Sequence, residues 1–383
     1  MIRRRDANAF VKSATPCPIV LLARSLGLGG SERQLTEVAM ALDRRFAPTV
    51  VCFDAAGVRG DDLRRAGVRI LELPVRSFVS PASAAIAWRF VRLLRRERVA
   101  LVHPFDVPTV LFAAPAARIA HVPVVLSSQR GDRRLFPRWH QRALDVTDRL
   151  VDGIVVNSDY IRCVLVEHFR VRDDRIHTCR NGVDTTVFHP EGRGRRPELG
   201  PCGAVVGIVA ALRREKSIET LIDAFARIQN AGARLVVVGE GPERDVLIAR
   251  AHQAGIAARS LFAPASLDVA SWYRSIDVFV LPSTNESFSN SLMEAMACGC
   301  AVIGSNVGGN PELVRHSDNG LLFEAGNAAD LAEKLQTVVG NPDLRRRLAA
   351  AAVRTIHGEY TREAAARRFA ELYEGFLNRS VRR

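Results

Sequence analysis

The chain has 383 residues, a length typical of two to three domains. Hydrophobic residues make up 48% of the sequence, enough for substantial buried cores, which excludes a disordered chain. No stretch reaches the roughly 18 consecutive apolar residues of a membrane-spanning helix, which excludes that class of protein as well. The composition and the net charge of +13 therefore predict a folded, soluble protein with a basic surface.

The basic charge is concentrated in the first half of the chain. Residues 1–198 contain 33 Lys and Arg against 21 Asp and Glu, whereas the remainder contains 21 against 20. Such an excess favours an anionic partner, namely a membrane surface, a phospholipid-linked molecule or a nucleic acid. A merely solvated surface of an arginine-rich protein explains it equally well. No RNA-binding motif is present, so nucleic acid is not expected.

The N-terminus has a basic head like that of a secretory leader. Its apolar run, residues 19–23, is too short for one, and no small-residue cleavage site follows. We therefore expect a cytoplasmic protein whose seven cysteines are reduced thiols. The basic residues read as a tail that leads into the first strand.

Residues 17–42 predict a strand, a glycine loop and a helix. Gly27, Gly29 and Gly30 allow a tight turn, and Ser31 can cap the helix. A dinucleotide-binding loop would need a third spaced glycine where this chain has Glu32. A dinucleotide site is therefore not expected here.

Residues 83–100 predict a basic amphipathic helix. Ile86, Phe90 and Leu94 share one side of it, and Trp88 lies near its start. Two interpretations remain open, a sheet-packing helix with a solvated face and a helix that docks on anionic lipid. The basic residues of the polar side are Arg89, Arg92, Arg95 and Arg96.

Two further strands, "VALVHPFD" and "VPVVLSSQRGD", end in polar loops. Ligands in open α/β sheets gather at the carboxyl ends of strands, so His103 and Arg130 are expected near the binding cleft. Arg130 fits a contact to a phosphate or an acceptor, and a structural arginine is an equally good interpretation. The Gly/Pro/Arg-rich residues 191–203 show no periodicity and predict a linker between two domains.

The second half opens with a strand whose carboxyl end is rich in cations. Arg213, Arg214 and Lys216 follow the strand that ends at about Ala210. Cations in this position would offset the charge of a leaving diphosphate. The next strand ends in a turn around Gly239.

Residues 276–312 read as one strand–loop–helix–strand unit. Backbone N–H groups where the loop enters the helix suit a diphosphate, and small polar side chains add further donors. Glu286 and Glu294 flank this position, about 12 Å apart if the steps between them are all helical. A nucleotide diphosphate sugar fits, with Glu286 on the sugar hydroxyls and Glu294 on the ribose hydroxyls.

The stretch "PSTNESFSNSLMEAMACGCAVIGSNVGGNPELV" resembles the retaining glycosyltransferases of family 4, which have the GT-B architecture. The glycine loop before Glu32 and "NGVD" at 181–184 resemble further elements of that family. The resemblance implies an α/β fold with two Rossmann-like domains facing across a cleft. We expect an acceptor domain at 1–198, a nucleotide-sugar donor domain at 199–360 and a C-terminal helix at 361–383 that crosses back to the first domain.

The chain departs from the family pattern at three points. Ser287 follows Glu286 where family members usually have glycine. Gln129 and Arg130 stand where they usually carry a histidine, and Ala211 stands where an arginine is common. Arg213 is therefore the candidate for the family's phosphate-binding arginine, and Lys216 matches its lysine.

The resemblance implies a metal-independent enzyme that moves a sugar, with retention, from a nucleotide diphosphate sugar to a glycan or lipid-linked acceptor. The absence of any Asp-x-Asp sequence agrees with an enzyme that needs no metal and no cofactor. The expected catalytic residues are Glu286, Arg213 and Lys216, and the expected acceptor-side residues are Arg130 and His103. The expected donor-binding residues are Gly29, Gly30, Gly239, Phe262, Ser287, Phe288, Ser289, Asn290 and Glu294.

Surface polysaccharide or glycolipid biosynthesis is the expected pathway, with the protein cytoplasmic or peripheral on the inner face of the membrane. Two alternatives remain open. Another GT-B nucleotide-sugar enzyme, such as an epimerase, would share the phosphate site, but it would need further acid–base carboxylates. A nucleotide-sugar-binding protein that has lost catalytic turnover would also keep this fold.

Overall fold

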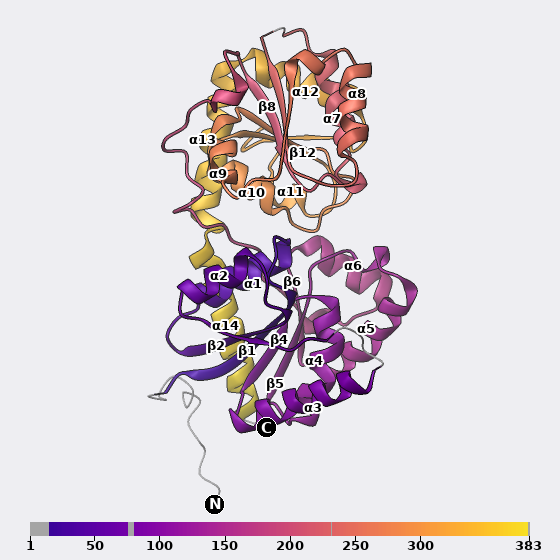
Figure 1. Ribbon diagram of the computed structural model, residues 1–383, viewed down its shortest axis with the longest axis vertical. Helices are drawn as coiled ribbons and strands as arrows, with labels where there is room; N and C mark the ends of the chain where they lie inside the picture. Colours follow the sequence, from indigo (N-terminus) through magenta and orange to yellow (C-terminus); the bar gives the residue numbers. More distant parts are fainter. Residues whose placement is uncertain (1–14, 76–79, 231, 382–383) are drawn as a thin grey trace, which may run out of the picture. The chain divides into compact units, whose positions relative to one another are not determined.

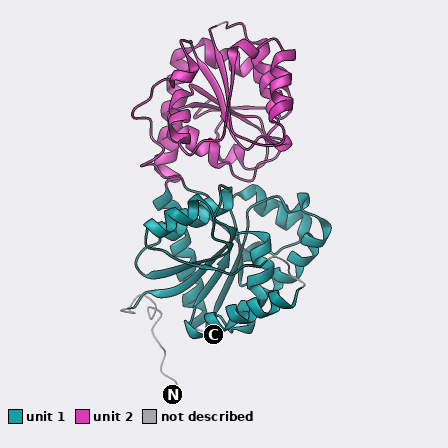
Figure 2. Cartoon of the chain, in the orientation of Figure 1, with its two compact units in different colours: residues 1–182, 362–383 teal, residues 183–361 magenta. Residues whose placement is uncertain are grey.

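The computed structural model describes residues 15–75, 80–230 and 232–381. These residues form two compact units (Figure 2), unit 1 from residues up to 182 and again from 362, and unit 2 from residues 183–361. Each unit is a parallel sheet with helices alternating along the chain (Figure 1), so the predicted α/β class is confirmed. The basic tail predicted for residues 1–14 lies outside the described residues.

The described part of unit 1 contains one sheet with strand order β3-β2-β1-β4-β5-β6-β7. The winding direction reverses between β1 and β4, and ligands of such sheets bind at the carboxyl ends beside that switch point. The strands are β1 (Cys17–Ser25), β2 (Phe46–Asp54), β3 (Arg69–Glu72), β4 (Leu101–Pro104), β5 (Val124–Gln129), β6 (Gly153–Val156) and β7 (Ile176–Thr178). The helices are α1 (Gly30–Ala41), α2 (Val58–Arg65), α3 (Pro81–Arg96), α4 (Val107–Ile119), α5 (Arg138–Leu150), α6 (Asp159–Phe169) and α14 (Arg362–Val381).

Unit 2 has the same winding, with strand order β10-β9-β8-β11-β12-β13 among its described residues. Its switch point lies between β8 and β11. The strands are β8 (Val205–Val209), β9 (Arg234–Val238), β10 (Ser260–Ala263), β11 (Val278–Leu281), β12 (Ala301–Ser305) and β13 (Leu321–Phe323). The helices are α7 (Ile218–Arg227), α8 (Arg244–Gln253), α9 (Val269–Ser275), α10 (Asn290–Ala297), α11 (Asn310–Leu313), α12 (Ala328–Gly340) and α13 (Pro342–Glu359).

The strands are almost continuously apolar because both faces of each sheet are covered. In β1, Ile19 and Leu21 pack into the core that contains residues of α1, α2 and α14. The intervening Val20 and Leu22 pack into the opposite core, which contains residues of α3, α4 and α6. A strand that is buried on both faces has no polar side, so it loses the alternation of an exposed strand.

The last helix, α14, completes the core of unit 1 (Figure 1). Phe369, Tyr373 and Phe376 are buried against the sheet. Tyr373 also reaches the side chain of His103 on β4, with 2.8 Å between its hydroxyl and the ring Nδ1. Unit 1 is therefore built from two stretches of chain that are separated by the whole of unit 2.

The predicted boundary at 198–199 is wrong, because residues 183–198 pack with unit 2. The backbone N–H of Val183 donates to the carbonyl of Tyr360 at 2.9 Å. Phe188 is buried against Tyr273, with 6.0 Å between the ring centroids. The chain thus enters unit 2 at Val183 and leaves it at Thr361.

Part of the predicted linker, residues 193–196, packs on unit 2. We call these residues the arginine strap. Arg193 donates to three backbone carbonyls, and Arg195 donates to two carbonyls and to the Asp277 carboxylate. The Arg196 guanidinium lies 4.4 Å from the centroid of the Trp272 ring. The carbonyls that Arg193 contacts, at 2.6 to 2.9 Å, are those of Ile276, Cys298 and Gly299.

Replacing Arg193 by methionine is expected to lower the free energy of unfolding of unit 2 by about 1–3 kcal/mol, because it leaves carbonyl oxygens without a donor. Urea unfolding measures the change. Arg227→Met is the matched control, because Arg227 is exposed on α7 and has no ion-pair or hydrogen-bond partner in the described part of the chain. The Arg227→Met variant should lose less than about 0.5 kcal/mol of unfolding free energy. Equal losses in the two variants would contradict a specific role for the strap.

Candidate active site

The loops that follow β8 and β11 meet at the switch point of unit 2. The backbone N–H of Thr284, after β11, donates to the carbonyl of Glu215, after β8, at 2.9 Å. The ammonium of Lys216 donates to the Glu286 carboxylate. The structure therefore brings together two of the residues predicted to be catalytic, in the place where the topology predicts a ligand.

Glu286 is held from both its side chain and its backbone. The Ser283 hydroxyl donates to the carboxylate at 2.8 Å, and Gly309 N–H donates to the Glu286 carbonyl at 3.0 Å. Gly308 has φ +58°, and a Cβ there would lie 1.7 Å from the same carbonyl oxygen. No local sequence pattern indicates that Gly308 and Gly309 support Glu286 in this way.

Arg213 and Lys216 lie on the same loop in different surroundings. Lys216 is half-buried in its pair with Glu286. Arg213 is exposed, and its guanidinium has no ion-pair or hydrogen-bond partner among the described residues. One cation is thus already engaged, and the other is available to a ligand.

Gly239 allows the ends of β8 and β9 to lie close together next to this loop. It has φ +146°, and a Cβ would lie 1.9 Å from the carbonyl oxygen of Ala210. Only glycine allows β9 to end so close to the chain leaving β8. Phe262, on the neighbouring β10, is half-buried against the core.

Helix α10 begins where the loop after β11 ends. The side chain of Ser289 caps the helix by accepting from Leu292 N–H at 3.2 Å. Asn290 is the first helical residue, Ser287 is half-buried in the preceding loop, and Glu294 is buried one turn further along. The helix terminus that the sequence predicted as a phosphate site is therefore present.

The ring of Phe288 is buried, with its centroid 5.7 Å from that of Tyr360. This contact anchors the loop to the end of α13. It links residues far apart in sequence, and no local pattern indicates it. The donor contact expected of Phe288 involves its backbone N–H, and it stays a prediction.

At the switch point of unit 1, Gly29 is the N-cap residue of α1, and Gly30 is the first residue of that helix. The Ser25 hydroxyl donates to the Glu32 carboxylate at 3.2 Å, which closes the glycine loop. The backbone N–H of Arg24 donates to Asp106 at 2.6 Å, which ties the ends of β1 and β4 together. The glycine loop thus lies where the topology predicts a ligand in this unit as well.

Arg130 follows β5, as predicted. Its guanidinium donates to the side chain of Asn181 and lies 5.6 Å from the centroid of the Phe105 ring. One terminal nitrogen, Nη1, is buried without a partner among the described residues. Burial lowers the pKa of Arg130 to about 10, so it remains a cation at neutral pH. A buried cation with a spare donor is suited to an anionic ligand.

His103 is not an acceptor contact, contrary to the prediction. Its ring is fully buried, with Nδ1 2.8 Å from the Tyr373 hydroxyl and Nε2 2.9 Å from the Ser128 hydroxyl. A neutral imidazole satisfies both neighbours, because one nitrogen donates and the other accepts. His103 therefore ties β4 and β5 to α14.

The buried His103 predicts a loss of stability in acid. Burial, with a smaller contribution from the charge of Arg130, lowers the pKa of His103 to about 3. The unfolded chain binds a proton near pH 6.5 and the folded chain does not, so stability falls as the pH drops below 6.5. The slope from this residue is about 1.4 kcal/mol per pH unit.

Urea unfolding of unit 1 at pH 6.5 and pH 5.5 tests this expectation against His103→Asn, which cannot titrate. The natural protein should lose about 1 kcal/mol more than the variant between the two pH values. Identical losses would show that His103 is protonated in the folded state.

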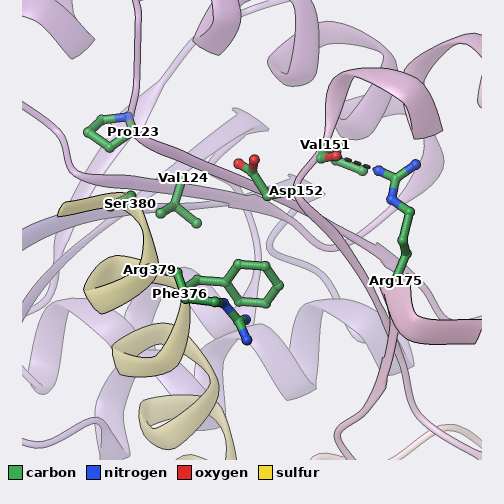
Figure 3. A pocket seen from close by; sticks show the side chains of 8 residues that line it. All are labelled: Pro123, Val124, Val151, Asp152, Arg175, Phe376, Arg379 and Ser380. Carbon is green, nitrogen blue, oxygen red and sulfur yellow. Dashed lines mark hydrogen bonds between the residues drawn. The ribbon is translucent and has the colours of Figure 1, made fainter. Parts of the chain in front are cut away.

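A second hollow lies at the opposite, amino-terminal edge of the unit 1 sheet (Figure 3). It has a volume of about 450 Å³, and the end of α14 forms one wall. The Arg379 guanidinium lies 4.4 Å from the centroid of the Phe376 ring rather than in an ion pair. The lining residues are Pro123, Val124, Val151, Asp152, Arg175, Phe376, Arg379 and Ser380.

No described helix is long and apolar enough to cross a membrane. Across residues 15–75, 80–230 and 232–381, no group of three or more His, Cys, Asp or Glu side chains is arranged to hold a metal ion.

Comparison with known proteins agrees with this architecture. Residues 28–187 match the family described as Glycosyltransferase Family 4, and residues 200–355 match Glycosyl transferases group 1. A D-inositol 3-phosphate glycosyltransferase from Rhodococcus opacus is 32% identical over 373 residues, which cover 91% of this chain and 75% of the relative. An N-acetyl-alpha-D-glucosaminyl L-malate synthase from Bacillus anthracis is 26% identical over 313 residues, covering 78% of this chain and 80% of the relative.

The fold also matches solved structures. HepE from Anabaena, crystallised with UDP and glucose, superposes with a TM-score of 0.85 at 22% identity, covering 94% of this chain and 100% of HepE. Two doubly wound sheets with loop-lined switch points make up the GT-B fold. The chain belongs to the group 1 glycosyltransferases of family 4, which confirms the predicted family and enzyme class.

Proposed function

We propose that this glycosyltransferase moves a sugar, with retention, from a nucleotide diphosphate sugar to a glycan or lipid-linked acceptor in surface polysaccharide or glycolipid biosynthesis. The observation that carries the proposal is the Lys216–Glu286 pair, which lies at the unit 2 switch point between the unpaired Arg213 and the start of α10. HepE, of the same fold, has been crystallised with UDP and with UDP-glucose, which supports a donor of this class.

The donor diphosphate would bind the N–H groups at the start of α10 together with Arg213 and Lys216. The helix dipole and two cations stabilise the negative charge that the leaving diphosphate gains in the transition state. These groups would take the role that a divalent metal has in other enzymes, so we propose a reaction without metal or cofactor. The buried carboxylate of Glu294 would hold the ribose hydroxyls.

Glu286 would orient the sugar rather than attack it. Its carboxylate already accepts from Ser283 and Lys216, which fixes its position and weakens it as a nucleophile. The remaining acceptor capacity suits sugar hydroxyl groups. The resemblance to family 4 supports retention, with the leaving phosphate deprotonating the acceptor on the same face.

The acceptor would carry an anionic group that binds Arg130. The spare, buried donor of Arg130 supports this assignment. The two relatives compared above are named for inositol 3-phosphate and for L-malate, and both compounds are anions. A phosphate on a lipid-linked acceptor has the same charge and donor requirement. Such an acceptor would place the enzyme at the inner face of a membrane.

A thermal-shift panel of nucleotide diphosphate sugars tests the donor. One or more donors should raise the melting temperature, because a ligand that binds only the folded state stabilises it by about 2.7 kcal/mol at a hundred times its dissociation constant. Glu294→Ala should abolish or weaken that response without changing the melting temperature of the free protein by more than a few degrees. If no donor raises the melting temperature, the proposal fails.

A further inference from the structure

Two helices of unit 1 expose tryptophan on the surface of one helical layer. α4 packs against both α3 and α5 (Figure 1). Most of its own side chains are buried. Trp88 on α3 is 52% exposed, and Trp139 on α5 is 58% exposed. Ile119, at the end of α4, is also exposed, and its carbonyl accepts from Arg95 of α3 at 2.6 Å. Large exposed apolar side chains on neighbouring helices of one layer favour an interaction site there.

Each helix combines its tryptophan with arginines on a single stripe. On α5, Trp139, Arg142, Val146 and Arg149 are all exposed and follow one another at spacings of three and four residues. The opposite side of α5 is buried at Leu144. Spacings of three and four residues place side chains on one face of a helix. The α3 stripe consists of Trp88, Arg92, Arg95 and Arg96. Together the two stripes are termed the tryptophan–arginine face.

Most arginines of this surface have no acidic partner. The nearby carboxylates are already paired, Asp145 with Arg133 and Glu97 with Arg69. Arg95 and Arg96 are partly engaged, Arg96 with Glu97. Within the described ranges, the following arginines on α3 and α5 form no hydrogen bond or ion pair: Arg89, Arg92, Arg138, Arg142 and Arg149.

The charge of the whole chain is concentrated in the same unit. Unit 1 has 36 Lys and Arg against 21 Asp and Glu, a net charge of +15. Unit 2 has 18 against 20, a net charge of −2. The basic excess is therefore a property of one unit rather than of an arginine-rich protein as a whole, which argues against a merely solvated surface.

We propose that the tryptophan–arginine face docks on an anionic lipid bilayer. Tryptophan is favoured at the level of the lipid headgroups, and arginines beside it are attracted to anionic lipids. A nucleic acid would match the charge but not the exposed Val146 and Ile119 among the arginines. The proposal rests on the proposed function in one respect, because docking would bring a lipid-linked acceptor to the enzyme.

Co-sedimentation with vesicles tests the docking at physiological ionic strength. The protein should bind vesicles of phosphatidylcholine with phosphatidylglycerol and should not bind phosphatidylcholine alone. The double variant Arg92→Gln with Arg149→Gln should bind about 25-fold less, about fivefold for each arginine. The matched control is Arg64→Gln with Arg65→Gln, which removes the same charge from exposed positions of α2, a helix of the opposite core. The vesicle binding of this control variant should fall by less than about threefold.

Tryptophan fluorescence separates insertion from general attraction. The third tryptophan of the chain, Trp272, is buried, so a blue shift with vesicles would come from Trp88 and Trp139. The shift should be absent in the double variant Trp88→Phe with Trp139→Phe. The proposal is overturned by absent sedimentation, by an equal loss in the α2 control, by an unshifted spectrum, or by RNA binding without vesicle binding.

The two proposals fail in different ways. If docking is correct, the Arg92→Gln, Arg149→Gln variant should lose vesicle binding but keep the thermal response of the natural protein to the nucleotide sugar that stabilises it. Vesicle binding without any response to nucleotide sugars would remove the proposed function and leave the docking surface. A response to a nucleotide sugar without vesicle binding would remove the docking surface and leave the proposed function.

Discussion

Replacing Glu286 by glutamine is expected to slow sugar transfer by about 10²- to 10³-fold while the fold stays intact. Glutamine has the same shape and can still accept from Ser283, so the loop should keep its position. It loses the negative charge that pairs with Lys216 and the strongest acceptor for sugar hydroxyls. The loss should therefore fall on kcat more than on donor binding.

Release of the nucleotide diphosphate measures this effect, with the melting temperature followed in parallel. Glu215→Gln is the matched control, because Glu215 lies on the neighbouring loop, is exposed, and has no side-chain partner in the described part of the chain. It should keep near-normal activity. Near-normal turnover of the Glu286 variant would remove that residue from the mechanism.

Replacing Lys216 by methionine is expected to lower kcat/KM by about 10²-fold. The change removes one of the two cations proposed to stabilise the leaving diphosphate. It also leaves Glu286 without its ion-pair partner, so both the donor and the sugar-orienting group are affected. Methionine keeps most of the length of the lysine side chain, so the packing of the loop should change little.

Arg214→Met is the control for Lys216. Arg214 is exposed on the same loop, and it has no ion-pair or hydrogen-bond partner within the described ranges. Lys216→Arg should restore part of the activity, because it returns the charge but not the compact geometry of the ammonium. If the Arg214 variant were as inactive as the Lys216 variant, the loop would act only through its total charge.

The two sheets could be predicted because parallel strands buried on both faces are short apolar runs that end in polar or glycine-rich loops. The same rule places the loops after β8 and β11 at one switch point. Lys216 and Glu286 are 70 positions apart, and both were predicted to belong to one site, but the ion pair that joins them could not be predicted from the sequence. The roles assigned to them stay predictions until the variants are measured.

The errors concern residues whose surroundings come from distant parts of the chain. His103 occupies a strand end where ligands gather, but α14, from the far end of the chain, covers it. The sequence of the arginine strap predicts a linker because it shows no hydrophobic periodicity. Sequence composition does not show whether the guanidinium groups donate hydrogen bonds to backbone carbonyl oxygens.

The discontinuous build of unit 1 has a consequence for how the protein is made. A ribosome synthesises β1 to β7 first, yet Phe369, Tyr373 and Phe376, which fill their core, are translated last. Unit 2 is formed by one continuous stretch of chain, so it can fold before α14, the last helix of unit 1, has been synthesised. A nonsense mutation just before Arg362 would therefore damage the amino-terminal half of the enzyme and spare the half nearest to the mutation.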